Sequence, residues 1–167
     1  MVDAVHFSSN RHDWETPPEV MKALEEVFGK FDLDPCATKE TKKAKRCFRA
    51  GVSGLDQPWR GKVFVNPPYG RKWKDAWIRK CHLEVAEGRA DLVVALLPSR
   101  TDTPGWHDYI MEATHVIFIR GRIRFVGADN SAPFPSVIVV WQKGLLGCPQ
   151  YSRLKIRRGG SPCGSSS

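Results

Sequence analysis

Apolar residues near the start of the chain recur at the spacing of a helix with one buried face. They follow a Thr-Pro-Pro step, and Gly29 stands directly after the last of them, as glycine often does at a helix end. We expect a helix whose apolar positions are Val20, Met21, Ala23, Leu24, Val27 and Phe28.

Short apolar runs further along the chain predict strands. Residues 31–35, FDLDP, alternate apolar and acidic side chains until a proline ends the run. The run DLVVALL at 91–97 is apolar almost throughout, as in a strand that is covered on both faces. Further strands are expected near Cys47 and over residues 62–65, 115–119 and 135–141, with helices over residues 73–85 and around 106–113.

The alternation of strands and helices predicts an α/β fold with an open, mostly parallel sheet. Ligands of such sheets bind beyond the carboxyl ends of the strands. The segments FDLDP and NPPYG both stand at predicted strand ends, so we expect them to meet at one edge of the sheet. We expect a single domain over residues 1–145.

Residues 146–167 differ in composition from the rest of the chain. They are basic at first and then rich in Gly and Ser, without the side chains that build a core. We expect a tail that is disordered beyond about Arg158.

Composition and charge narrow the choice of partner and compartment. The 26 Lys and Arg against 18 Asp and Glu give a net charge of +8, which favours a polyanionic partner such as DNA. Five scattered cysteines without a CxxC pair indicate reduced thiols. The chain shows neither a secretory signal nor the roughly 20 apolar residues that span a membrane. We expect a soluble, cytoplasmic protein, with a monomer favoured.

The histidines give little support to a metal site. Cys81 and His82 are adjacent, but neither His107 nor His115 provides a second closely spaced ligand pair for zinc. Structural histidines and no bound metal are expected.

Residues 66–69, Asn-Pro-Pro-Tyr, follow the predicted strand 62–65 and suit the methylation of an amine. An exocyclic aromatic amine is a poor nucleophile because its lone pair is delocalised, so the pair must be aimed at an activated methyl group. The Asn66 side chain and the Pro67 backbone carbonyl can each accept one amine hydrogen, while Pro67 and Pro68 make the turn rigid. Tyr69 offers a flat face to a base that has left its duplex. This chemistry requires no general base.

Further segments match a known family. WETPP, FDLDPCA, VNPPYGR, LLPSRTDTPGWH, RGRIRF and APFPSVIVVW occur in this order over about residues 13–143. In these segments the chain resembles the phage-type DNA N-6-adenine methyltransferase (Dam-like) family. The resemblance implies a Rossmann-like methyltransferase fold, a mostly parallel sheet with an antiparallel last strand, S-adenosylmethionine as methyl donor and a flipped adenine in DNA as acceptor, methylated at specific sites.

The resemblance also implies a cofactor site at the end of the first strand. The carboxylate of Asp34 would meet the methionine ammonium of the donor. Many methyltransferases follow this acid with a glycine-rich turn, but here DPCATKETK contains no glycine. The residues expected to bind the cofactor are Thr16, Pro17, Asp34, Pro35, Cys36 and Asp56.

Three features are candidates for DNA contact. By the resemblance, Phe134 covers the flipped base opposite Tyr69, although an ordinary buried phenylalanine at a strand start would show the same pattern. Arg120, Arg122 and Arg124 alternate, so in an extended segment they project to one side and can grip phosphates or simply face solvent. The basic segment 39–49 suits either a solvated loop or a wall of the DNA channel.

Other acceptors and another class of protein stay open. Cytosine in DNA, adenine in RNA and protein glutamine can all use a similar turn, and the net charge favours nucleic acid over glutamine. A catalytically inactive DNA-binding module of the same fold is the alternative outside enzymes, against which the intact tetrapeptide and Asp34 argue.

Overall fold

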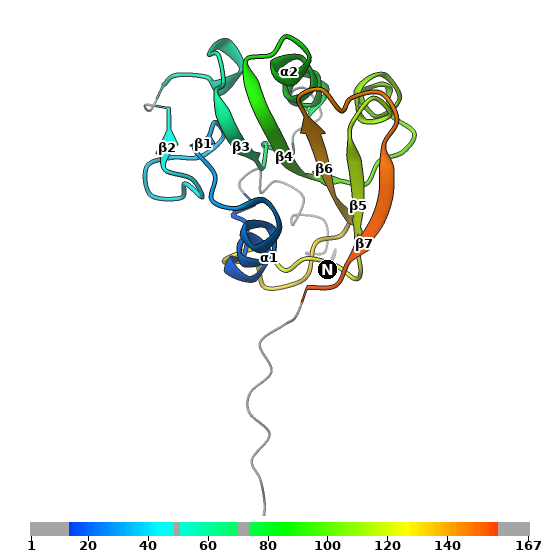
Figure 1. The fold of residues 1–167 in the computed structure, drawn as a ribbon. Helices are drawn as coiled ribbons and strands as arrows, with labels where there is room; N and C mark the ends of the chain where they lie inside the picture. The colour runs from blue at the N-terminus through cyan, green and yellow to red at the C-terminus, as the bar shows by residue number, and fades with distance from the viewer. Residues whose placement is uncertain (1–13, 49–50, 70–73, 157–167) are drawn as a thin grey trace, which may run out of the picture.

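A seven-stranded sheet forms the centre of the computed structural model, which describes residues 14–48, 51–69 and 74–156 (Figure 1). The strands lie side by side in the order β2-β1-β3-β4-β6-β5-β7. Their bounds are Leu33–Asp34 (β1), Arg46–Cys47 (β2), Gly61–Val65 (β3), Ala90–Pro98 (β4), His115–Ile119 (β5), Ser136–Gln142 (β6) and Gln150–Leu154 (β7).

One strand of this sheet runs against the others. β2, β1, β3 and β4 pair in parallel, whereas β6 pairs antiparallel with both β4 and β5. β5 therefore runs in the same direction as β4, and β7 is parallel to β5. The predicted Rossmann-like α/β fold is confirmed, with its antiparallel strand in the predicted segment. The carboxyl ends of β1 and β3 consequently lie at the same edge of the sheet.

Each face of the sheet is covered by its own layer. The helix α1, Pro18–Phe28, and the segment 120–134 pack on one face. The other face is covered by the helix α2, Lys74–Ala86, by a 3-10 turn, Gly54–Asp56 (η3), and by a π-helical turn, Trp106–Ile110 (η4). Successive residues of β4 enter the two layers alternately, so the apolar run at 91–97 is covered on both faces as predicted.

The predicted helix near the start of the chain is present, but one of its apolar positions faces solvent. Val20, Met21 and Leu24 of α1 are buried, whereas Val27 is 68% exposed. The spacing of three and four residues from Val20 through Leu24 to Phe28 defines the buried stripe, and Val27 lies outside it. The expectation that Val27 belongs to the buried face is wrong.

The sheet extends past residue 145, so the domain end expected from the sequence is too early. β7 adds an edge strand over Gln150–Leu154, inside the segment expected to be a tail. Its side chains are mostly exposed and show no apolar alternation, which is why the pattern did not reveal a strand. Backbone pairing with β5 and the stacking of Tyr151 on Phe118 hold it in place. The expected disorder beyond Arg158 concerns residues outside the described ones.

Glycine at position 54 fixes the loop that follows β1. A Cβ at Gly54 would lie 2.4 Å from the carbonyl oxygen of Pro35. The indole N–H of the buried Trp59 donates to the Gly54 carbonyl at 2.9 Å. η3 is thus in direct contact with Pro35, the residue after Asp34, and helps to place that loop.

Replacing Gly54 by alanine is expected to lower the free energy of unfolding by about 3 kcal/mol, because the added methyl group meets a backbone oxygen that cannot move aside. Gly51→Ala is the control: its methyl group enters open space, and only the positive φ of 81° makes it unfavourable, by about 1 kcal/mol. Urea unfolding measures both losses, and equal losses would contradict the steric role of Gly54.

Candidate active site

A cavity of about 280 Å³ lies at the carboxyl ends of β1 and β3, where the two predicted segments were expected to meet. It is bounded by the entry to α1, the loop after β1 and the turn after β3. Its lining residues are Trp14, Glu15, Thr16, Asp34, Cys36, Ala37, Thr38, Thr41, Lys43, Phe64, Asn66, Pro67 and Pro68.

Asp34 places a buried carboxylate in the wall of this cavity. The residue is 3% exposed, and its two oxygens accept hydrogen bonds from the backbone N–H groups of Cys36, at 3.3 Å, and Lys43, at 3.0 Å. Burial raises the pKa of the Asp34 carboxyl to about 6, although these hydrogen bonds act in the opposite direction. The nearby Lys43 ammonium bonds to Glu15 instead. A cationic ligand in the cavity would therefore stabilise the ionised form of Asp34.

Only part of the expected cofactor site lines the cavity. Thr16 and Cys36 do, beside Asp34. Pro17 stands at the entry to α1, and its carbonyl accepts hydrogen bonds from the first turn of the helix. Pro35 is buried against η3, and Asp56 is an exposed residue at the end of η3. The structure does not bring Pro17, Pro35 or Asp56 into the cavity wall.

The turn after β3 places the Asn66 amide at the cavity through three hydrogen bonds. Its Nδ2 donates to the backbone carbonyl of Trp14 and, at 2.9 Å, to Oγ1 of Thr16. Its Oδ1 accepts a hydrogen bond from the Tyr69 hydroxyl at 2.8 Å. Pro67 and Pro68 complete this wall. Asn66 is thus tied to the segment before α1, about 50 residues earlier in the chain.

Four aromatic rings gather beside the turn. The ring of Tyr69 contacts Phe134 edge to face, with 5.4 Å between the ring centroids, and also contacts Phe125. Trp14 packs against both phenylalanines. The predicted partners Tyr69 and Phe134 are therefore neighbours, but their perpendicular contact leaves no parallel slot for a base. The two rings have to separate before a base can stack on Tyr69.

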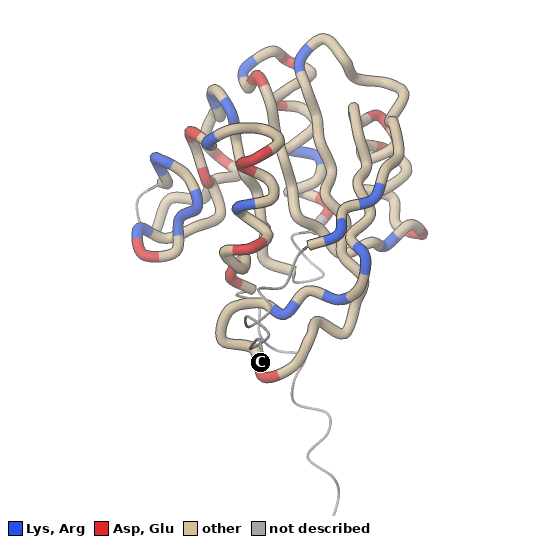
Figure 2. Tube along the Cα trace, turned by 60° about the horizontal axis from the view of Figure 1, so that its bottom comes forward, with Lys and Arg blue, Asp and Glu red and all other residues tan. Residues whose placement is uncertain are grey.

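The three arginines after β5 are exposed, but the segment that carries them bends at Gly121, whose φ is 84°. Arg120, Arg122 and Arg124 are exposed, whereas Ile123 and Phe125 are buried. Nε of Arg124 donates to the Ala128 carbonyl at 3.1 Å. Figure 2 shows Lys and Arg along this segment and in the loop between β1 and β2. Exposed and buried residues alternate only from Arg122 to Phe125, so the bend at Gly121 separates Arg120 from the predicted pattern. The buried side of this alternation reaches the aromatic group through Phe125.

Comparison with known proteins decides the family. A family model described as DNA N-6-adenine-methyltransferase (Dam) matches residues 5–145. The chain belongs to this family. The match covers most of the chain and includes every residue of the predicted site, so the family resemblance in the sequence motifs is confirmed.

Two phage proteins with sequences similar to this chain are also described as DNA N-6-adenine-methyltransferases. A DNA N-6-adenine-methyltransferase of Escherichia phage T1 is 33% identical over 109 residues, which cover 64% of this chain and 44% of the relative. One of Haemophilus phage HP1 (strain HP1c1) is 28% identical over 125 residues, which cover 73% of this chain and 70% of the relative. The matched part thus spans less than half of the phage T1 protein.

Among solved structures, a predicted O-methyltransferase, protein Atu636 from Agrobacterium tumefaciens, matches with a TM-score of 0.36 and 17% identity over 62% of this chain and 46% of that one. A match this distant identifies no site residue.

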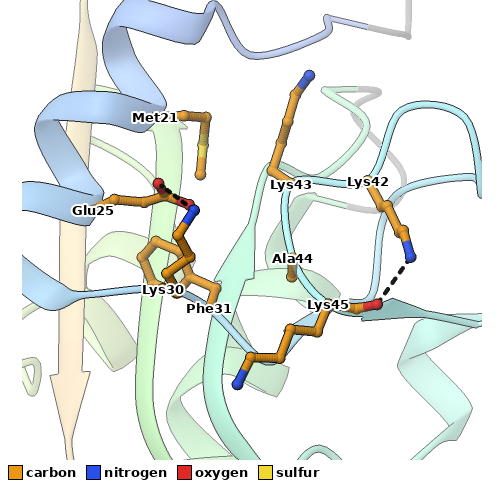
Figure 3. Close-up of a pocket in the computed structure, with 8 residues that line it drawn as sticks. All are labelled: Met21, Glu25, Lys30, Phe31, Lys42, Lys43, Ala44 and Lys45. Atoms are coloured by element: carbon orange, nitrogen blue, oxygen red, sulfur yellow. Dashed lines mark hydrogen bonds and ion pairs between the residues drawn. The ribbon is translucent and has the colours of Figure 1, made fainter.

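A second cavity, of about 390 Å³, lies beside the candidate active site of this Dam-family chain. Figure 3 shows Lys30 directed toward the Glu25 carboxylate and the Lys42 ammonium reaching the Lys45 carbonyl. Lys45 in turn pairs with Asp32, so much of the positive charge here is already balanced. Lys43 lines both cavities, which places part of the basic segment 39–49 next to the candidate active site.

The sequence pattern missed several lining residues. Trp14 stands in the family segment WETPP, but its contribution to Asn66 is a backbone carbonyl, which no side-chain motif reveals. Thr41 and Lys43 belong to the basic segment 39–49, which has no apolar periodicity. Their proximity to Asp34 results from the fold of the loop after β1.

No group of three or more His, Cys, Asp or Glu that could hold a metal ion occurs within the described residues. Likewise, none of the helices in this part of the chain is long and apolar enough to cross a membrane.

Proposed function

We propose that this chain transfers a methyl group from S-adenosylmethionine to the exocyclic amine of a flipped adenine in DNA, at specific sites. The observation that supports this most strongly is the shared cavity at the ends of β1 and β3. The buried carboxylate of Asp34 and the amide of Asn66 both line it, so a cationic donor and an amine acceptor can be held side by side.

The residues at the end of β1 fit the methyl donor. The carboxylate of Asp34 is buried and accepts hydrogen bonds from two backbone N–H groups. An ammonium group, with its positive charge, is therefore a suitable further partner. Thr16 and Cys36 line the same space. When bound, S-adenosylmethionine supplies a methyl group activated by a positive sulfur. Pro17, Pro35 and Asp56, also expected here from the family resemblance, would act from outside the cavity wall.

The residues at the end of β3 suit the acceptor. Oδ1 of Asn66 and the carbonyl of Pro67 can each accept one hydrogen of an amine. These two hydrogen bonds would direct the nitrogen lone pair at the activated methyl group. The nitrogen becomes positive when it gains the methyl group and then releases a proton to solvent. Burial raises the pKa of Tyr69 well above its ordinary value, so this phenol stays protonated and acts as a hydrogen-bond donor and stacking surface.

The aromatic group beside the turn is the proposed entrance for the base. An adenine that has left the duplex can recover part of the cost of flipping by stacking on Tyr69 and Phe134 once these rings separate. Arg120, Arg122 and Arg124 are proposed to bind backbone phosphates, since all three are exposed and Arg124 directly precedes Phe125 of the aromatic group.

Replacing Arg124 by alanine is expected to weaken DNA binding and to reduce the slope of log K against log salt by about 1, because one phosphate contact is lost. Arg79→Ala is the matched control, since Arg79 is exposed on α2, at the opposite face of the sheet. Fluorescence anisotropy with a labelled duplex at several salt concentrations measures both. If the two variants lose affinity equally, the effect is only one of net charge.

One assay tests the proposed function directly. The protein is incubated with methyl-labelled S-adenosylmethionine and DNA, and the product is digested to nucleosides. Label in N6-methyl-2′-deoxyadenosine is expected. Label in methylated cytosine, label only when RNA or a glutamine peptide replaces DNA, or binding of DNA without any transfer would each overturn the proposal and identify one of the other acceptors or an inactive binding module.

A further inference from the structure

The amide of Asn66 is held from its nitrogen side. Nδ2 carries two hydrogens, and the structure gives each of them an acceptor: the backbone carbonyl of Trp14 and Oγ1 of Thr16. Thr16 is 2% exposed, so its hydroxyl makes this contact away from bulk water. With both N–H groups engaged, only Oδ1 of Asn66 remains to receive a ligand.

Oδ1 of Asn66 can accept one further hydrogen bond. A carbonyl oxygen has two lone pairs, and the Tyr69 hydroxyl uses one of them at 2.8 Å. The other lone pair can accept an amine hydrogen without displacing Tyr69. Turning the amide over would bring Oδ1 against the Trp14 carbonyl, where two acceptors would face each other.

We propose that Thr16 is a positioning residue for Asn66, which together with the Trp14 carbonyl fixes the amide so that Oδ1 faces the acceptor. This inference rests on the proposed function. It gives the site a chemical preference: a fixed oxygen accepts from an amino group but repels a keto oxygen at the same place. Thr16 was expected from the family resemblance to bind the cofactor, and the two roles predict different kinetics.

Thr16→Val removes the hydroxyl and keeps the shape of the side chain, so one N–H of Asn66 loses its acceptor. Turnover at saturating S-adenosylmethionine is expected to fall roughly tenfold, because a lost buried hydrogen bond weakens the hold on the amide. The dissociation constant of S-adenosylmethionine is expected to change by less than about threefold. Thr16→Ser restores the hydroxyl and is expected to recover most of the turnover.

Two kinetic results would overturn the positioning role. The first is recovery of normal turnover in Thr16→Val once the donor is saturating, since Thr16 would then only bind the cofactor. The second is a serine variant as slow as the valine variant. Thr114→Val is the control for stability, because the Thr114 hydroxyl accepts a hydrogen bond from the Gln142 backbone and lies outside the cavity.

The orientation of the amide can also be measured without activity. In a ¹H–¹⁵N spectrum the side-chain NH₂ pair of Asn66 is identified by its loss in Asn66→Ala. This pair is expected to shift and to exchange faster with water in Thr16→Val, but not in Thr16→Ser or Thr114→Val. An unchanged pair in Thr16→Val would overturn the inference. If the NH₂ signals of Asn66 shift as expected but the protein methylates no nucleic acid, the proposed function is refuted, whereas the contact between Thr16 and Asn66 is not.

Discussion

Replacing Asn66 by alanine is expected to lower the rate of methyl transfer by roughly 10²- to 10³-fold, the usual effect of removing a group aimed at the reacting centre. The variant loses Oδ1, which is proposed to accept an amine hydrogen, while Pro67 and Pro68 still shape the turn. Single-turnover kinetics with saturating labelled donor measures the step itself. Affinity for the donor is expected to stay within about threefold, because the Asp34 end of the cavity is unchanged.

The structure adds a cost in stability to this variant. The Asn66 side chain bonds to Trp14, Thr16 and Tyr69, so its removal is expected to lower the free energy of unfolding by about 1–3 kcal/mol. Asn130→Ala, the same change at an exposed position, is the control. Transfer within tenfold of wild type by a folded Asn66→Ala protein would refute the assignment.

The affinity for S-adenosylmethionine is expected to fall about tenfold for each pH unit below about 6, because a proton on Asp34 removes the negative charge that faces the donor's ammonium. The ammonium keeps its charge over this range. The affinity should level off near pH 7 and fall again toward pH 8, where an α-ammonium with an ordinary pKa of about 7.7–8.0 loses its proton. Calorimetric titration between pH 4.5 and 8 measures this dependence.

Two variants separate Asp34 from other acids. Asp34→Asn is expected to bind the donor weakly at pH 7, with little further change down to pH 5. Asp91→Asn alters an exposed acid at the start of β4, remote from the cavity, and should keep the wild-type profile. A wild-type dissociation constant that does not vary with pH, or an unchanged affinity in Asp34→Asn, would remove Asp34 from the site.

The same carboxyl group makes the stability of the free protein depend on pH. Since the pKa of Asp34 is raised on folding, the native state holds its proton more tightly than the unfolded state between about pH 4 and 6. This contribution favours folding at low pH and is lost as the pH rises through about 6, with a difference of about 2–3 kcal/mol. Comparing urea unfolding of wild type and Asp34→Asn at pH 4.5 and 7 isolates it.

Most of the fold could be predicted because its strands carry strong signals. The apolar run at 91–97 and the valine-rich run at 135–141 became the central strands β4 and β6. β7 could not be predicted, since an exposed edge strand is held by backbone pairing, which almost any residue except proline can provide. The orientation of Val27 was mistaken because apolar content alone does not define which side of a helix is buried.

The candidate site was predictable in its parts but not in its connections. Asp34 and the tetrapeptide at 66–69 stand at strand ends, and parallel pairing of β1 with β3 brings strand ends together. The bonds from Asn66 to Thr16 and Trp14 join positions about 50 residues apart and involve a backbone carbonyl. No local pattern encodes such contacts.

The sequence by itself determined the family, the alternation of strands and helices, and the two strand-end segments with their chemistry, because periodicity and motif residues are local properties of the chain. Only the tertiary structure decided that Asp34 is buried with a raised pKa, that Tyr69 and Phe134 meet edge to face, and that Thr16 holds the Asn66 amide. Burial, ring geometry and the direction of a hydrogen bond depend on which distant segments pack together, and that is a property of the whole fold.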